Sequence, residues 1–304
     1  MLTVGTFDGI HRGHADLIAR VVARARSVGL PSVVVTFQPH PLEVVNPPAA
    51  PLLLTPGDEK IEALADTAID YVAVVPFDAA LAAFPAATFV RRVLRERFAM
   101  RELWIGYDHG LGRGREGDAN ALRALGERDG FPVEVVNAVA LDDGAPVSSS
   151  AIRAALGAGD VDAVVGALGR RYSVRGRVVP GDQRGRALGY PTLNVALPNA
   201  RKLLPAAGVY AVAVQSALGA FGGMMNLGPR PTFGDAALSL EVHLFGASGD
   251  WYGADVRIEF VRRLRDVVRF PGVDALVAQL GRDAEAARLA LTEVKTGLNL
   301  NGSA

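Results

Sequence analysis

The sequence predicts an α/β protein whose first half is a doubly wound parallel sheet and whose second half is an antiparallel barrel or sandwich followed by a helix. In the first half, apolar β-rich runs alternate with stretches of helical period. From Tyr172 onward, short β-rich runs are separated by Gly, Pro, Asn and Asp. The segment 273–292 has the apolar stripe of one amphipathic helix.

Strands and helices can be placed in order along the first half. The strand candidates are 2–5, 32–37, 71–76, 102–106 and 133–139. The helix candidates are 14–28, 57–67, 86–98 and 118–129. Gly29 and Pro31 end the first of these helices. Strands alternating with helices of this length predict a parallel sheet covered on both faces.

The second half contains shorter elements. Its strand candidates are 172–179, 192–196, 209–214, 221–226, 238–245 and 255–260. A small helical stretch at 151–168 joins the halves. We therefore expect domains at 1–168 and 169–295 and a tail at 296–304.

Composition excludes several classes of protein. The 304 residues suggest two domains, and 32 basic against 32 acidic residues give no net charge, which argues against a general nucleic-acid binder. The absence of cysteine excludes disulfides, zinc–thiolate sites and cysteine nucleophiles, and it fits a cytoplasmic protein. Asp8 and His11 interrupt any early apolar stretch and no long apolar run exists, so we expect neither signal peptide nor membrane span.

The most informative segment is GTFDGIHRGH at residues 5–14, between the first strand and the first helix. Backbone N–H groups and the positive end of a helix dipole favour an anion at such a junction. Glycines allow a phosphate to approach closely, and His11 and His14 can donate hydrogen bonds to its oxygens. The alternative is a pair of ordinary loop histidines.

These residues resemble the HxGH nucleotidyltransferases, and in particular the family of bacterial bifunctional riboflavin kinase/FAD synthetases. Three further segments resemble the same family: TFQPHP at 36–41, GYDHGLGR at 106–113 and VSSSAIR at 147–153. In the second of these, Asp108 and Gly112 match the family's GxDFxFG, whereas His109 and Leu111 replace its two aromatic residues. Members of this family carry residues before the first strand, so we expect the sequence to begin late.

The residue types in the segment 147–153 indicate a possible binding role even without the family resemblance. Ser148 or Ser149 can cap a helix N-terminus, and Arg153 can hold a phosphate bidentately. The alternative is a plain serine cap with a solvated arginine. A second motif, GRGREG at 112–117, satisfies the dinucleotide pattern GxGxxG. It follows the fourth strand and no clear acidic strand end comes about 20 residues later, so we reject a dehydrogenase.

The second half contains a glycine-studded segment, 176–189, followed by PTLN at 191–194. Thr192 and Asn194 are two apart on a strand and therefore share a face, where their oxygens could meet one magnesium ion. Leu193 points to the other face and replaces the alanine of the family's PTAN. Glu241 lies on the polar face of LSLEVHLF, where a solvated charge is the alternative.

The resemblance implies a nucleotidyltransferase fold in the first domain and a flavokinase-type barrel with a terminal helix in the second. It implies that riboflavin is phosphorylated to FMN and that FMN is adenylylated to FAD, with ATP, Mg²⁺ and these flavins as ligands. The implied catalytic residues are Glu241, as base on the riboflavin 5′-hydroxyl, and His11, His14 and Arg153 at the ATP phosphates. The implied binding residues are Gly5, Phe7, Asp8, Gly13, Asp108, Ser148, Ser149, Ser150, Gly176, Gly181, Gly185 and Gly189, with Thr192 and Asn194 as metal ligands.

Two rivals stay open on the sequence. The first is a riboflavin kinase whose adenylyltransferase-like domain is inactive, and the replacements at His109 and Leu111 motivate it. The second is a flavin- or nucleotide-binding regulator without turnover. Small molecules are the expected partners, and a homo-oligomer is left open.

Overall fold

The computed structural model describes residues 1–141, 144–181, 184–229 and 238–300. The chain divides into two compact units, Met1–Ser149 and Ser150–Ala304, which are described separately. No helix among the described residues has the length and apolar character needed to cross a membrane. The predicted domain boundary at residue 168 stays a prediction.

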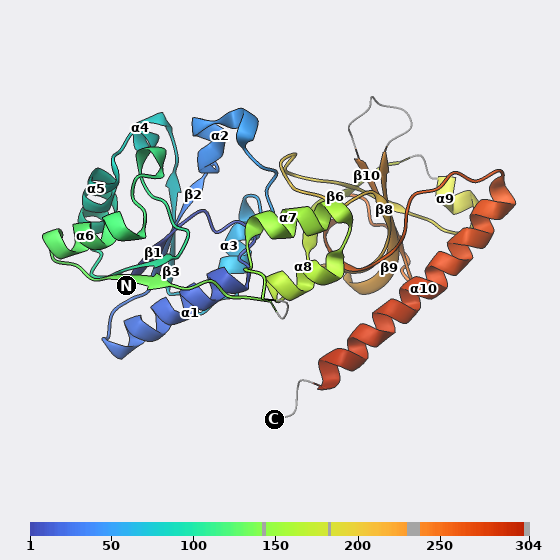
Figure 1. Ribbon diagram of the computed structural model, residues 1–304. Coiled ribbons are helices and arrows are strands. Elements are labelled where there is room, and N and C mark those ends of the chain that lie inside the picture. The colour runs from blue at the N-terminus through green and yellow to red at the C-terminus, as the bar shows by residue number, and fades with distance from the viewer. Residues whose placement is uncertain (142–143, 182–183, 230–237, 301–304) are drawn as a thin grey trace. The chain divides into compact units, whose positions relative to one another are not determined.

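The first unit is built on a five-stranded parallel sheet in the order β3-β2-β1-β4-β5 (Figure 1). Its strands are β1 Leu2–Val4, β2 Val33–Gln38, β3 Tyr71–Pro76, β4 Leu103–Gly106 and β5 Val133–Val136. The order reverses between β1 and β4, which makes the carboxyl ends of these two strands the expected ligand crevice. The doubly wound sheet predicted from the sequence is confirmed.

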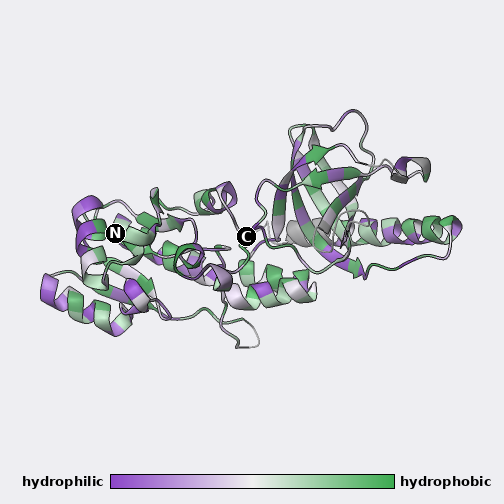
Figure 2. Cartoon of the chain, turned by 90° about the horizontal axis from the view of Figure 1, so that it is seen from above, coloured by the Kyte–Doolittle hydropathy of each residue, from purple (hydrophilic) through white to green (hydrophobic). Residues whose placement is uncertain are grey.

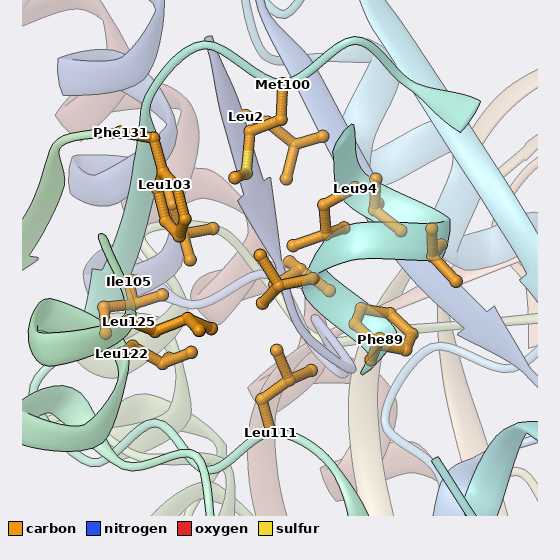
Figure 3. Packing of buried hydrophobic residues seen from close by; sticks show 14 of the residues in the cluster. Leu2, Phe89, Leu94, Met100, Leu103, Ile105, Leu111, Leu122, Leu125 and Phe131 are labelled. Carbon is orange, nitrogen blue, oxygen red and sulfur yellow. The ribbon is translucent and has the colours of Figure 1, made fainter. Parts of the chain in front are cut away.

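Successive side chains of a strand point to opposite faces of the sheet, and in these strands the side chains on both faces are mostly apolar. Helices therefore cover both faces of this sheet. Val34 packs with α1 (Arg12–Ser27) and α3 (Asp58–Ala65), whereas Val35 packs with the cluster on the opposite face. That cluster includes Phe89, Leu94, Leu122 and Leu125 (Figure 3). The remaining helical elements are α2 Pro41–Val45, η1 Pro47–Ala49, α4 Ala79–Ala82, α5 Ala86–Phe89, η2 Val90–Arg97, η3 Arg113–Arg115 and α6 Ala119–Asp129.

The second unit is a closed six-stranded antiparallel barrel in the order β10-β7-β6-β11-β8-β9. Its strands are β6 Ser173–Val179, β7 Leu193–Ala196, β8 Gly208–Ser216, β9 Gly219–Pro229, β10 Leu238–Leu244 and β11 Asp255–Arg265. Helices α7 (Ser149–Ala158) and α8 (Val161–Leu168) precede the barrel, and α9 (Arg184–Ala187) lies between β6 and β7. Closure occurs because β10 pairs with both β7 and β9, which selects a barrel over a sandwich.

The terminal helix α10, Val273–Leu300, packs on the outside of the barrel. Ala284, Ala287 and Ala290 are buried against Ala211 and Met224. The helices of both units carry hydrophobic and hydrophilic residues side by side, as amphipathic helices do (Figure 2). The sequence-based end of this helix at residue 292 was too early, since α10 continues to Leu300; residues 301–304 of the expected tail lie outside the described residues.

Candidate active sites

The turn between β1 and α1 has an unusual backbone. Phe7, Gly9 and Ile10 have φ values of 45°, 89° and 39°. Residues other than glycine rarely adopt such positive φ values. A Cβ on Gly9 would lie 2.7 Å from Leu54 Cδ1, so glycine is required there. Non-glycine residues at positive φ cost on the order of 1–3 kcal/mol each and persist where surrounding contacts impose them, often at functional sites.

Asp8 supplies several of those surrounding contacts. Its buried carboxylate, 2% exposed, accepts hydrogen bonds from the backbone N–H groups of Leu54 at 3.0 Å and Thr55 at 2.9 Å. The Asp8 carbonyl accepts a bond from Ser149 Oγ at 2.9 Å. These bonds tie the turn to residues 54–55 and to the start of α7, so the structure gives Asp8 a positioning role, and its predicted contact with a cofactor stays a prediction.

The two histidines of the HxGH motif are stacked. Their ring centroids lie 3.7 Å apart with an interplanar angle of 16°. His11 caps α1, and its Nδ1 accepts a hydrogen bond from His14 N at 3.3 Å. Because Nδ1 is the acceptor, neutral His11 carries its proton on Nε2. A Cβ on Gly13 would lie 3.2 Å from Nδ1 of His11. Glycine at this position therefore avoids a close contact with the His11 ring that caps the helix.

His14 is held neutral. Burial lowers its pKa well below the ordinary value, and the neighbouring His11 and Lys60 lower it further. The ring of Phe7 lies 5.1 Å away, and His14 Nδ1 has no hydrogen-bond partner within the described chain. His14 can therefore offer a hydrogen bond to an anion without bringing a standing positive charge.

Sequence reasoning missed a cation, Lys60, whose charge acts on His14. Lys60, on α3, donates to the Phe37 carbonyl at 3.2 Å and approaches Thr36 Oγ1 at 3.5 Å. Burial lowers its pKa, while Asp8 and Glu43 act in the opposite direction. One signal was available: Lys60 is one of three lysines in a chain that otherwise uses arginine for its basic residues.

The loop after β4 follows the second of the two strands, β1 and β4, between which the strand order reverses. Asp108 is exposed, and its carbonyl accepts a bond from Arg115 Nη2 at 2.9 Å. Backbone bonds between Leu111 and Gly117 close the loop. Gly112 has a φ of 77°. A Cβ on Gly112 would lie only 2.5 Å from the backbone N of Ala86.

The two residues that replace the family's aromatics have different surroundings. Leu111, 6% exposed, extends into the same core cluster as Phe89 and Leu122 (Figure 3). His109 is partly buried, and its Nε2 has no hydrogen-bond partner among the described residues. Burial, followed by the charge of Arg115, lowers its pKa to about 4. Leu111 is therefore a packing residue, and His109 is neutral at physiological pH.

The predicted serine–arginine segment lies at the start of α7. This helix begins at Ser149, directly after Ser148, and continues through Ser150 to Arg153 and beyond. Ser149 Oγ donates to the turn that carries the histidines, through Asp8. The binding roles of Ser148, Ser150 and Arg153 stay predictions.

In the barrel, the register brings the predicted kinase residues together. Glu241 on β10 lies directly opposite Asn194 on β7 and, on the other side, opposite Asn226 on β9. Residues directly opposite one another across antiparallel strands share a face. Glu241 therefore lies between two asparagine side chains on that face. Leu193 pairs with the buried Val242, as expected for the opposite face.

The glycine-rich segment packs directly on the predicted metal ligands. A Cβ on Gly181 would lie 2.0 Å from Asn194 Nδ2, and one on Gly185 would lie 3.5 Å from Thr192 Oγ1. Gly189 has a φ of 80°. Gly176 instead belongs to β6, where a Cβ would lie 2.3 Å from Val195 Cγ1, so packing within the barrel already explains this glycine.

His243 is a second residue that sequence reasoning left without a role. It lies two residues after Glu241 on β10, and its Nδ1 is 2.8 Å from the Pro191 carbonyl. Its ring also contacts the ring of Tyr190 at 5.3 Å. These contacts hold the segment that leads into Thr192 against β10. Beyond Pro229, at the end of β9, residues 230–237 lie outside the described part.

Comparisons with known proteins match each half of the chain to a family. The family model for FAD synthetase matches residues 1–151, and the one for riboflavin kinase matches residues 168–291. Relatives named bifunctional riboflavin kinase/FMN adenylyltransferase include one from Escherichia coli (strain K12), 38% identical over 95% of this chain and 91% of its own length. Another, from Pseudomonas fluorescens, is 39% identical over 94% and 91%.

A solved structure from Streptococcus pneumoniae, named as a macrolide-efflux protein, superposes with a TM-score of 0.86 at 32% identity, covering 94% of this chain and 93% of that one. A nucleotidyltransferase-type α/β unit and a flavokinase-type barrel, each with its own polar site, define a two-domain nucleotide-dependent transferase. The chain belongs to the bifunctional riboflavin kinase/FMN adenylyltransferase family, which confirms the resemblance carried by its motifs.

Proposed function

We propose that this chain phosphorylates riboflavin to FMN in its barrel and adenylylates FMN to FAD in its parallel-sheet unit, using one ATP for each step. The observation that carries the proposal is that each unit holds its own set of polar groups. Stacked His11 and His14 lie at the carboxyl end of β1, and Glu241 lies opposite Asn194 on the barrel.

In the adenylyl transfer, an oxygen of the FMN phosphate attacks the α-phosphorus of ATP and pyrophosphate leaves. Such a displacement requires positioning and neutralisation of charge rather than a covalent nucleophile. His11 and His14 donate hydrogen bonds to the ATP phosphates, and the α1 N-terminus adds backbone N–H groups. Arg153 and the serines at 148–150 bind the departing pyrophosphate in this proposal.

In the kinase reaction, the riboflavin 5′-hydroxyl oxygen attacks the γ-phosphorus and ADP leaves. Glu241 accepts the proton of that hydroxyl, a contribution worth about 100- to 10,000-fold in rate. Asn194 and Asn226, directly across from Glu241, orient it by their cross-strand placement. The glycines at 181 and 185 let the loop backbone approach the phosphates.

The donors near Thr192 suit Mg²⁺. Thr192 and Asn194 offer hard oxygen atoms, the type that this ion prefers. Mg²⁺ is usually bound by one or two protein oxygens together with substrate phosphates. Magnesium would neutralise charge on the phosphates as the transfer proceeds. The cytoplasm, where ATP is available, is the expected location.

The direct test is incubation with riboflavin, ATP and Mg²⁺, followed by chromatographic separation of the flavins over time. FMN should appear first and FAD later. FMN without FAD would favour the rival in which the first domain is inactive, as the replacements at His109 and Leu111 suggest. Bound flavin without either product would favour a regulator.

A further inference from the structure

The adenylyltransferase site needs a positive charge that neutral His14 does not provide. ATP and FMN both bring phosphate oxyanions, and the His14 imidazole is neutral at physiological pH. Hydrogen-bond donors alone leave much of that charge uncompensated, so a cation in the site would contribute strongly in a partly buried environment. Lys60 is a cation of the first unit whose charge acts on His14.

The position of Lys60 follows from the sheet order. Its ammonium donates to the carbonyl of Phe37, at the carboxyl end of β2. Thr36, the other neighbour of the ammonium, donates its hydroxyl at 3.1 Å to the carbonyl of Thr6 in the histidine-bearing turn. Because β1 and β2 are adjacent and parallel, their carboxyl ends meet, and one threonine separates the ammonium from that turn.

The bonding of Lys60 is incomplete. An ammonium has three N–H donors. Thr36 Oγ1 and the Phe37 carbonyl accept from two of them, so one N–H of Lys60 can still donate to a ligand. Lys60 is only partly exposed, and it forms no ion pair within the described residues. Burial lowers its pKa, and the negative charges of Asp8 and Glu43 act against that shift without forming such a pair. Lysines withdrawn from water are normally paired, because an uncompensated charge there is costly.

We infer that Lys60 is an anion-binding residue of the adenylyltransferase site, whose ammonium contacts phosphate oxygens of ATP beside His14. This inference rests on the proposed function. The alternative is that Lys60 only fastens α3 to β2. The two differ in what the side chain must supply: the substrate contact needs a positive charge, whereas fastening needs only hydrogen-bond donors.

The test compares Lys60→Gln, Lys60→Arg and, as a matched control in the same unit, Arg20→Gln, which removes a charge from an exposed pair with Asp16. FAD formation from FMN and ATP should fall about 100-fold or more in Lys60→Gln, the usual loss for one transition-state contact. It should be partly retained in Lys60→Arg and unchanged in Arg20→Gln. FMN formation from riboflavin reports on folding of the same preparations and should be unchanged in all three.

Chemical rescue removes the remaining ambiguity, because the natural chain has no cysteine. In Lys60→Cys, the single thiol is alkylated with 2-bromoethylamine, which restores an ammonium, or with iodoacetamide, which adds a neutral amide. Rescue of FAD formation by the first reagent alone supports the inference. Equal rescue by both, rescue by neither, or full activity in Lys60→Gln overturns it. Absence of FAD formation in the unsubstituted protein would instead contradict the proposed function.

Discussion

At the scale of single residues, we expect the HxGH pair to act through hydrogen bonds, because burial keeps His14 uncharged. His11 is fixed by capping α1 and His14 by stacking on His11, so both rings are oriented before any ligand binds. Preorganised donors are effective because no reorganisation is needed at the moment of reaction.

Replacing His14 by Ala should therefore lower FAD formation from FMN and ATP by about 100- to 1,000-fold, the loss expected for one transition-state donor. The measurement is the initial rate of FAD formation by chromatography, with FMN formation from riboflavin as the control for folding. An unchanged rate of FAD formation would refute the role of His14.

His109 makes the first unit sensitive to acid. Its pKa is about 4 in the folded protein, below the ordinary value of 6.5, so the unfolded chain takes up the proton first as pH falls. The stability contributed by neutral His109 is complete above about pH 6.5 and is lost progressively toward pH 4; at pH 5 the loss is about 2 kcal/mol.

This loss can be measured with the two tryptophans, one in each unit. Trp251→Phe leaves Trp104, on β4, as the fluorescence reporter of the first unit. In that background, urea unfolding at pH 7.5 and pH 5 should show a larger drop in the free energy of unfolding with His109 than with His109→Gln. The same drop in both would show that His109 is not the group responsible.

The type and spacing of the HxGH residues predicted that His11 and His14 lie together where a strand leads into a helix, and the structure places them there; their catalytic roles stay predictions. The sequence did not predict Lys60 or the bonds of Asp8. Both depend on which strands become neighbours: Lys60 reaches the site only because β2 lies beside β1, and Asp8 meets Leu54 and Thr55 from 46 and 47 residues away.

At the scale of elements, Gly181 packs directly against Asn194 of β7. Gly181 lies against the Asn194 amide so closely that any side chain would displace it. A displaced amide no longer faces Glu241 across the strand pair.

Gly181→Ala should therefore reduce FMN formation from riboflavin at least about 10-fold, since small misplacements in a site cost large factors in rate. FAD formation from supplied FMN should be unchanged. Gly272→Ala is the matched control, because a Cβ there meets nothing within 4 Å. Equal kinase rates in Gly181→Ala and the unsubstituted protein would show that this glycine has no effect on the site.

Most elements were predictable from their hydrophobic period, and the exceptions have physical causes. The stretch 86–98 was expected to be one helix, and it is α5 followed by the π-helical η2. The apolar positions Phe89, Val90, Val93 and Leu94 fit either form, so the period does not report the change in hydrogen bonding. Strand β11 extends to Arg265, five residues beyond the expected end, with two register shifts that disturb its alternation.

At the scale of the whole molecule, each unit contains its own core and its own site. Closure of the barrel was predicted by the family resemblance and not by the strand patterns, because alternating patterns describe single strands and not the pairing of β10 with β7 and β9. The division of labour could be predicted, because each half carries a separate set of motifs.

Two independent sites predict that each activity can be lost alone. The most direct measurement is a pair of assays on Glu241→Ala and His14→Ala: FMN formed from riboflavin and ATP, and FAD formed from supplied FMN and ATP. Glu241→Ala should abolish the first product and leave the second, and His14→Ala should do the reverse. Loss of both activities in either variant, with the protein still folded, would contradict the account.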